Sequence, residues 1–188
     1  MPKDFYEVFD ELSEQTNHDI VESVLRDNKM DINAQDDDGH TFLMLACANG
    51  DNKTVQKLIE KGADTEITDS EGRKALHHAF SAGESESIRL VLEKDKDIDA
   101  KDNKGQTCLH IVCEKQSRKS YGDETRENNI KKLLISGAKT DIKDKNGNIA
   151  LELSSLEDRA STAELFINKR QLSEEKDLEQ SERKRMRT

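Results

Sequence analysis

The chain has 188 residues, of which 37% are charged, 32% hydrophobic and only 4% aromatic, and its formal net charge is -10. This composition argues against a conventional globule with a broad apolar core, and leaves either disorder or a thin, elongated fold. Periodic apolar segments favour the elongated fold. The negative charge argues against direct nucleic-acid binding and favours a protein partner with a basic segment.

The sequence shows neither a membrane span nor a signal peptide, and this indicates the cellular compartment. No stretch approaches the roughly 20 apolar residues of a membrane span, and the start MPKDFYEVFDEL is too acidic for a signal peptide. We therefore expect an intracellular, cytoplasmic protein without membrane contact. Its three cysteines are expected to be free thiols in a reducing compartment. We also expect a monomer without a cofactor.

The first 35 residues predict two short helices and a hairpin. The segment FYEVFDEL has apolar residues at helical spacing, namely Phe5, Val8, Phe9 and Leu12, and DIVESVLRDNKMDINAQ has the pattern of a second helix and a turn. We interpret residues 1–35 as the unit that covers the N-terminal end of the fold.

From residue 36 the chain repeats itself. Gly39, Gly72, Gly105 and Gly147 lie 33, 33 and 42 residues apart, so the last interval is one period of 33 plus 9 residues. Such a period is typical of proteins in which each unit packs only on its neighbours. The units are residues 36–68, 69–101, 102–143 and 144–168, and each opens with an aspartate: Asp36, Asp69, Asp102 and Asp144.

Each unit predicts two amphipathic helices, because apolar residues recur in shared columns. The first helix carries Leu43, Leu76, Leu109 and Leu151, and three positions later Ala46, Ala79, Val112 and Ser154. The second carries Val55, Ile88, Ile130 and Ala163, and three positions later Leu58, Val91, Leu133 and Phe166. We expect Gly62 and Gly137 to end second helices, since glycine takes the left-handed C-cap conformation.

This pattern resembles the ankyrin repeat: a turn, two antiparallel helices and a hairpin to the next unit. The family hallmark, Thr-Pro-Leu-His at the first helix, is degraded but legible as TFLM at 41, KALH at 74, TCLH at 107 and IALE at 149. Proline is missing from every unit, although helix starts tolerate other residues there. The resemblance covers about residues 17 to 168. It implies an all-α solenoid with short β-hairpin tips and five units, the capping units being 1–35 and 144–168.

The nine additional residues of unit 102–143 lie within EKQSRKSYGDETRENN, residues 114–129, between its two helices. The stretch is polar and balanced in charge, which favours a surface loop opposite the tips. The alternative is a binding or phosphorylation loop centred on Ser120 and Tyr121.

Residues 169–188 differ in composition from the repeats. The segment KRQLSEEKDLEQSERKRMRT is rich in charge, and Leu172 and Leu178 are too sparse to pack a helix well. We expect a frayed helical extension or disorder. The basic run 183–187 is a candidate nuclear import signal, and an ordinary basic chain end is the alternative.

The segment TCLHIVC, residues 107–113, places two cysteines and a histidine close together. In the repeat register His110 shares a column with His77, and at three positions from Thr107 it can satisfy backbone donors at a helix start. Cys113 falls in an inward column with Cys47, which suits a small buried side chain. We therefore expect a structural cluster.

The sequence motifs give little evidence for a catalytic or metal-binding site. A zinc site needs three or four converging ligands, and no CxxC or HxxxH spacing supplements the cluster. We identify no Gly-rich phosphate loop and no set of nucleophile, base and orienting residue. We expect no enzyme and no metal site; the rival interpretation is a small enzyme or metal protein built on Cys108, His110 and Cys113.

His78 is unusual, because its column otherwise holds Leu45, Ile111 and Leu153. We expect a buried, hydrogen-bonded histidine, and a local pH-sensitive contact is the alternative.

The resemblance to ankyrin repeats implies a partner-binding surface on the concave face, formed by the tips and the first helices. The candidate tip residues surround the repeat-opening aspartates, and the candidate groove residues follow the first helices. They are Asp37, Asp38, His40, Ser70, Glu71, Arg73, Asn103, Lys104, Gln106, Lys145, Asn146 and Asn148 on the tips, with Asn49, Ser81 and Lys115 in the groove.

The tips also carry a charge gradient. The first has three consecutive aspartates, residues 36–38, whereas the later ones carry Lys101, Lys104, Lys143 and Lys145. We hypothesise that a basic stretch of a partner lies against the first tips; charge that merely keeps the solenoid soluble is the alternative. The sequence thus predicts a non-enzymatic adaptor or regulator. An inhibitor or chaperone that masks a basic segment of one client, such as a nucleic-acid-binding protein, is the second hypothesis.

Overall fold

The computed structural model describes residues 31–95, 97–114, 122–155 and 158–168. Helices there come in pairs: α3 (Phe42–Ala48) with α4 (Asn52–Glu60), α5 (Ala75–Ala82) with α6 (Ser85–Leu92), α7 (Cys108–Cys113) with α8 (Asp123–Ile135), and α9 (Ala150–Leu153) with a last helix at 159–168. None of these helices is long and apolar enough to cross a lipid bilayer. The predicted helices of residues 1–30 and the tail 169–188 lie outside the described residues.

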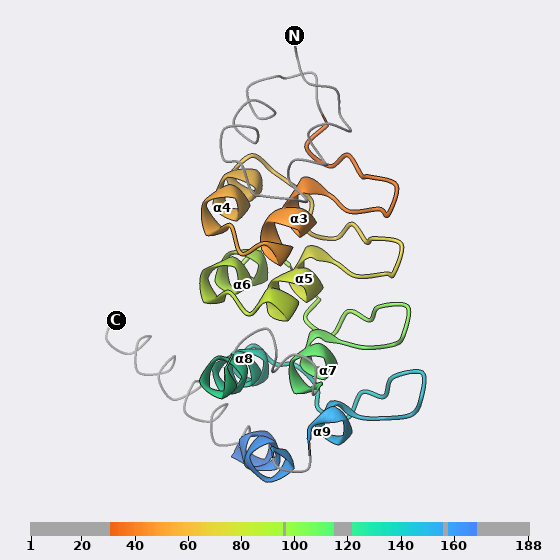
Figure 1. The fold of residues 1–188 in the computed structure, drawn as a ribbon, viewed down its shortest axis with the longest axis vertical. Coiled ribbons are helices and arrows are strands. Elements are labelled where there is room, and N and C mark those ends of the chain that lie inside the picture. The colour runs from red at the N-terminus through yellow and green to blue at the C-terminus, as the bar shows by residue number, and fades with distance from the viewer. Residues whose placement is uncertain (1–30, 96, 115–121, 156–157, 169–188) are drawn as a thin grey trace, which may run out of the picture.

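The helix pairs stack into an elongated array (Figure 1). Helices α3, α5, α7 and α9 form one row in which each packs on the next, and α4, α6 and α8 lie beside it in a second row. Hairpin-like loops project from the first row on the side away from the second. In the described residues β structure is limited to isolated antiparallel bridges, for example between Gln35 and Thr41. The predicted all-α solenoid is confirmed.

Apolar side chains between the two rows form a continuous core. The predicted leucine column of the first helices is buried at Leu43, Leu76 and Leu109, each 1% exposed. Leu151 is only half-buried, because it belongs to the last unit and no further first helix in the described part of the chain covers it. The core is therefore built by stacking, as expected when one unit cannot bury its own apolar face.

Two second helices end at the glycines expected to stop them. Gly62 follows the C-cap Lys61 of α4 with φ +90°, and Gly137 follows the C-cap Ser136 of α8 with φ +99°. A positive φ costs little only without a Cβ, so these glycines end the helices without strain.

The insertion of unit 102–143 differs from the expected loop. Helix α8 begins at Asp123, so residues 123–129 are helical and make α8 longer than α4 or α6. Arg126 and Asn129 are 4% and 0% exposed, against the expectation of a surface position. Residues 123–129 contain no glycine or proline, so the helix that carries Leu133 and Leu134 can extend back to Asp123. Residues 115–121, with Ser120 and Tyr121, lie outside the described residues.

The second row opens between α6 and α8. A groove of about 540 Å³ there is lined by Leu92 of α6 and Ile135 of α8 among charged side chains. Because α4 packs directly on α6, this opening interrupts an otherwise regular row.

Candidate protein-binding surface

Each tip is held by the aspartate that opens its repeat. One carboxylate oxygen of Asp69, Oδ1, accepts the backbone N–H groups of Glu71 and Arg73, both at 2.9 Å. The same oxygen of Asp36, Asp102 and Asp144 accepts the N–H groups two and four positions later. The opening aspartates therefore fold the turns.

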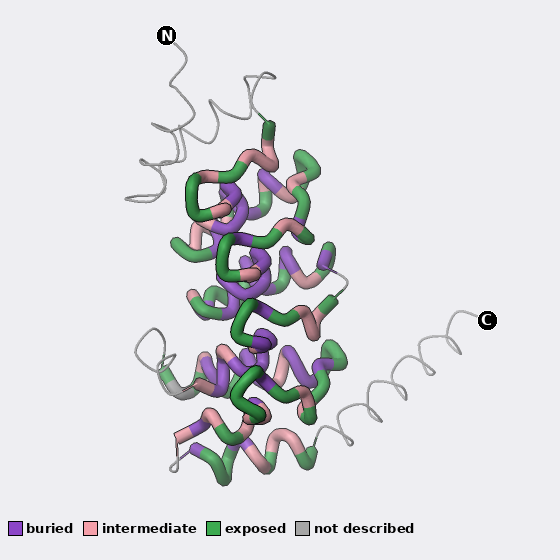
Figure 2. Tube along the Cα trace, turned by 90° about the vertical axis from the view of Figure 1, so that its right-hand side faces the viewer, coloured by how far each residue is buried: buried purple, intermediate pink, exposed green. Residues whose placement is uncertain are grey.

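The tips are joined to one another by backbone hydrogen bonds. The N–H of Ser70 donates to the carbonyl of Asp38 at 2.9 Å, and that of Asn103 donates to Glu71 at 2.7 Å. The N–H of Lys145 continues the series to Lys104 at 2.9 Å. Residues 36–40, 69–73, 102–106 and 144–148 thus form one continuous edge, which we call the tip ridge. Figure 2 looks onto this ridge, with buried first helices behind it.

The predicted tip residues divide into two groups by exposure. The exposed ones are Asp37, Asp38, Ser70, Glu71, Asn103, Lys104, Lys145 and Asn146. The half-buried ones are His40, Arg73, Gln106 and Asn148, whose backbone N–H groups all bond to the opening aspartate of their own tip. The first group is available for contact with another molecule, while the second mainly stabilises the turn. Lys115 lies outside the described residues.

Charge changes sign along the tip ridge. Asp37 and Asp38 are exposed on the first tip, and Lys104 and Lys145 are exposed on the third and fourth. The exposed Lys101 lies beside the last tip, where its Nζ donates to the carbonyl of Lys143 at 3.0 Å. A long partner would therefore meet an acidic surface at one end and a basic surface at the other.

A groove of about 340 Å³ lies between the first two described helix pairs. It is lined by the ends of α3 and α5 and the residues that follow them: Ala48, Asn49, Gly50, His78, Ser81, Ala82 and Glu84. Asn49 and Ser81, two of the predicted groove residues, thus share one concavity, and both are exposed. His78 joins them, although the sequence analysis did not count it among the groove residues.

The hallmark histidines have the structural role that the sequence predicted. Nδ1 of His110 accepts the N–H of Thr107 at 3.2 Å, and Nε2 lies 3.3 Å from the carbonyl of Asn148 in the next tip. Burial lowers the pKa of His110 more than the bond to Asn148 raises it. A neutral ring, with Nε2–H as donor and Nδ1 as acceptor, fits this geometry. His77 makes the same pair of contacts, with Lys74 and Ala100.

The cysteines are buried free thiols. Burial raises the pKa of Cys113 to about 12 and that of Cys47 and Cys108 further still. They are therefore protonated at neutral pH, which does not suit a nucleophile. This supports the structural interpretation of TCLHIVC.

His78 is buried and hydrogen-bonded, as the sequence predicted. Its Nε2 lies 2.9 Å from Oδ2 of Asp69, and burial lowers the pKa of His78 to about 4. Burial alone would raise the pKa of Asp69, but hydrogen bonds from Arg73 and His78 and the charge of Arg73 lower it. We therefore describe this pair at neutral pH as a carboxylate that accepts an N–H from a neutral imidazole.

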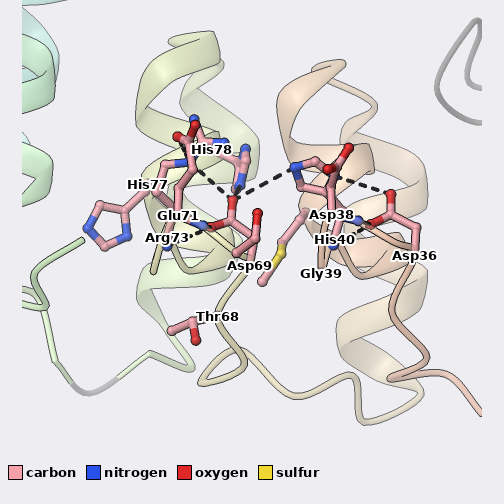
Figure 3. Close-up of polar contacts among 12 residues, drawn as sticks. Asp36, Asp38, Gly39, His40, Thr68, Asp69, Glu71, Arg73, His77 and His78 are labelled. Atoms are coloured by element: carbon pink, nitrogen blue, oxygen red, sulfur yellow. Dashed lines mark hydrogen bonds and ion pairs between the residues drawn. The ribbon is translucent and has the colours of Figure 1, made fainter. Parts of the chain in front are cut away.

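Sequence reasoning did not find the group that forms around Asp69. His40 of the preceding tip turns its Nε2 toward the same carboxylate oxygen, at 3.8 Å (Figure 3). His40, Asp69 and His78 lie 29 and 9 positions apart in the chain, so no local motif reports their approach. The repeat register could have found them, because stacking places a tip beside the next tip and its first helix.

Comparison with known proteins agrees with the geometry. Residues 11–102 and 43–121 match the family model for ankyrin repeats (3 copies). Together these matches span residues 11–121, or 111 of the 188 residues. A comparison with curated proteins gives no match. Ankyrin repeats generally mediate protein–protein interaction and are generally non-enzymatic. Since the match covers more than half of the chain and the described helix pairs stack as such repeats do, the chain belongs to the ankyrin-repeat family.

Proposed function

We propose that this protein is a non-enzymatic adaptor or regulator that binds a protein partner along the tip ridge and the adjoining groove, with a basic segment of the partner on the acidic first tip. The observation that carries the proposal is the row of exposed polar side chains on a ridge whose own turns are already satisfied. Asn103 and Glu71 also help to hold the tips, through Nδ2 of Asn103 to the carbonyl of Ser70 at 2.9 Å and through Glu71 to Arg73 at 3.2 Å. The aspartates of the first tip and the lysines of the third and fourth tips remain exposed at regular places.

Two features support a basic partner segment. The side chains of Asp37 and Asp38 are exposed, whereas the third and fourth tips expose lysines that would repel the same segment. Opposite charge at one end and like charge at the other fixes the direction in which a charged chain lies. The groove beside the first tips, lined by Asn49, Ser81 and Glu84, offers further polar contacts.

A second function rests on the same acidic tip. An inhibitor or chaperone that masks the basic segment of one client, for example a nucleic-acid-binding protein, would use this surface in the same way. The two functions differ in the number of partners and in whether the client loses its own activity when bound. We also propose a monomer of five units, 1–35, 36–68, 69–101, 102–143 and 144–168, in the cytoplasm or nucleus.

The test is the charge-reversed variant Asp37→Lys, Asp38→Lys. Partners captured by the intact protein and by the variant are compared by mass spectrometry. For each partner lost, a peptide covering its basic segment is titrated by fluorescence anisotropy at low and high salt. We expect at least a tenfold loss of affinity in the variant and a strong salt dependence in the intact protein.

The matched control is Glu124→Lys, Glu164→Lys, which makes the same change in net charge. Both residues are exposed: Glu124 lies on α8 and Glu164 on the last helix at 159–168, and neither belongs to a tip. Binding that survives in this control but not in the tip variant supports the proposal. Equal binding in all three proteins would exclude the acidic tip as the binding surface. Several lost partners favour an adaptor, and a single client that is inactivated when bound favours masking.

A further inference from the structure

Two histidines from successive repeats converge on one buried carboxylate. Nε2 of His78 lies 2.9 Å from Oδ2 of Asp69, and Nε2 of His40 lies 3.8 Å from the same oxygen. These three atoms all lie within 4.8 Å of one another. Figure 3 shows the rings of His40 and His78 both turned toward the carboxylate of Asp69, whereas the ring of His77 points away from it.

The donor set and its spacing fit zinc. Imidazole nitrogen and carboxylate oxygen are common zinc ligands at about 2.0 to 2.2 Å, so two ligand atoms of a tetrahedral site lie about 3.3 Å apart. The separations of 2.9 and 3.8 Å lie on either side of that value. Small rotations of two side chains would place all three atoms at bonding distance from one ion, and the proton of His78 would move from Nε2 to Nδ1 so that Nε2 offers its lone pair.

A carboxylate behind His40 orients its ring. Nδ1 of His40 lies 3.2 Å from Oδ2 of Asp36, while Oδ1 of Asp36 holds the turn. Donation from Nδ1–H to Asp36 leaves the lone pair on Nε2, directed toward Asp69. A carboxylate on the far nitrogen is a recurrent support of histidine ligands, because it fixes the tautomer and raises the basicity of the ligand.

The surrounding charge favours a cation, although one positive group is near. Nε of Arg73 lies 3.1 Å from Oδ2 of Asp69 and 3.2 Å from Glu71. Asp36, Asp69 and Glu71 outnumber this single guanidinium by two charges. Asp69 is 1% exposed at its side chain, and His78 and His40 are 10% and 23% exposed. The buried carboxylate of Asp69 is held in one position, and the partly exposed imidazoles of His40 and His78 can be reached by an ion from solvent.

We propose that His40, Asp69 and His78 form a three-ligand site for zinc or a similar divalent transition ion, with the fourth position open to water on the concave side. The ligands come from two successive units, so a bound ion joins the first tip to the next tip and its first helix. Binding therefore stabilises the folded array over the unfolded chain, in which these residues are not held together.

Two substitutions can remove ligands without damaging the fold, because the other repeats already use them. Asn148 takes the place of His40 in its own tip and keeps a contact with the opening aspartate, at 3.4 Å from Asp144. Leu45, Ile111 and Leu153 take the place of His78. His40→Asn and His78→Leu are therefore the test variants, and His18→Ala, at a histidine outside the described residues, is the control.

The experiment is titration of the intact, chelator-treated protein with Zn²⁺ by isothermal calorimetry, together with thermal unfolding followed by circular dichroism. We expect one ion per chain and a rise in Tm with Zn²⁺. Each test variant should lose at least tenfold in affinity and lose the rise in Tm, while His18→Ala retains both. Mg²⁺ and Ca²⁺, which prefer oxygen ligands, should bind far more weakly. With Co²⁺, d–d bands without a thiolate charge-transfer band would exclude the cysteines as ligands.

Melting in the presence of chelator checks that the variants fold. No uptake of Zn²⁺ by the intact protein at micromolar concentration would overturn the proposal. Uptake that is equal in His40→Asn, His78→Leu and the control would overturn it as well, since the ion would then bind elsewhere. Neither result bears on partner binding by Asp37 and Asp38.

Discussion

The first and last parts of the described array follow one repeat pattern but differ in how their buried polar groups are satisfied. In the first, Oγ1 of Thr54 donates to Asp51 at 2.5 Å, and both the N–H and the hydroxyl of Ser87 donate to Asn52 of the preceding unit. In the last, buried atoms lack a hydrogen-bond partner among the described residues at Arg126, Asn129 and Thr162, whereas in the first part Oδ2 of Asp95 is such an atom.

The comparison is sharpest within one column of the second helices. Thr54, Ser87, Asn129 and Thr162 each precede the apolar residue of the repeat pattern, and all are at most 1% exposed. The first two are satisfied and the last two carry atoms without a partner in the described part of the chain. An unpaired buried polar group costs about 1 to 3 kcal/mol. Equal burial in a repeat array therefore does not give equal stability, and we expect the last units to open first.

The largest expected effect comes from the leucine column. Leu76→Ala should lower the free energy of unfolding by about 2 to 5 kcal/mol, because it leaves a cavity at a fully buried site. Leu151→Ala, at a half-buried site in the last unit, should cost less than about 2 kcal/mol. Urea unfolding followed by circular dichroism measures both. Equal losses would mean that the last unit is packed as tightly as unit 69–101.

Alanine substitutions at two tip glycines compare the stacking of an inner tip with that of the last tip. Gly72 and Gly147 have φ +75° and +86°, so alanine strains both, by about 1 to 2 kcal/mol. Only at Gly72 would the new Cβ also approach the next tip, at 2.9 Å from the backbone nitrogen of Asn103. We expect Gly72→Ala to cost at least about 1 kcal/mol more than Gly147→Ala in the same unfolding measurement. A larger cost at Gly147 would contradict the stacking of the tips.

Replacing the side-chain amide of Asn129 should reduce the difference in stability between the first and last parts of the array. Asn129→Leu removes two buried polar atoms that have no hydrogen-bond partner in the described part of the chain and keeps the branching of the side chain at Cγ, so stability should rise by about 1 kcal/mol. The matched variant Thr54→Val breaks a satisfied bond and should lower stability by about 1 kcal/mol. Thermal unfolding compares them. A loss of stability in Asn129→Leu would show that the amide is satisfied in solution.

The smallest expected effect is a pH dependence at His110. Its pKa in the folded protein is lowered from the ordinary value of 6.5 by burial. Above pH 6.5 the ring is neutral in both states and its contribution to stability is full. Below this pH the unfolded chain binds a proton more readily than the folded one, so stability falls until the folded pKa is passed. In His110→Gln the midpoint of urea unfolding should fall less between pH 7 and 5; an unchanged slope would contradict the neutral ring.

The sequence predicted what one repeat determines for itself. Leucine spacing identified the buried face of each first helix, and the glycines at 62 and 137 identified helix ends, because local periodicity and backbone conformation decide both. It also predicted the contact of His110 with Thr107, since the two are three positions apart on one helix start.

What the sequence did not predict depends on how one unit meets the next. The approach of His40 to Asp69 depends on the spacing between tips, which no single unit specifies. The burial of Arg126 depends on where α8 begins and on what packs against its first turns, whereas composition alone suggested a polar loop. Partner-binding roles for the tip residues stay a prediction, because exposure identifies available side chains and not what they bind.

The backbone bonds between tips have a mechanical consequence. Each one ties a tip to its neighbour at a fixed length, so this edge of the array resists stretching. Among the described residues, no backbone hydrogen bond ties α6 to α8, where the two helices line an open groove. Bending of the array should therefore pivot on the tips and widen or close that groove, so the curvature offered to a partner can change while the spacing of the tip side chains stays constant.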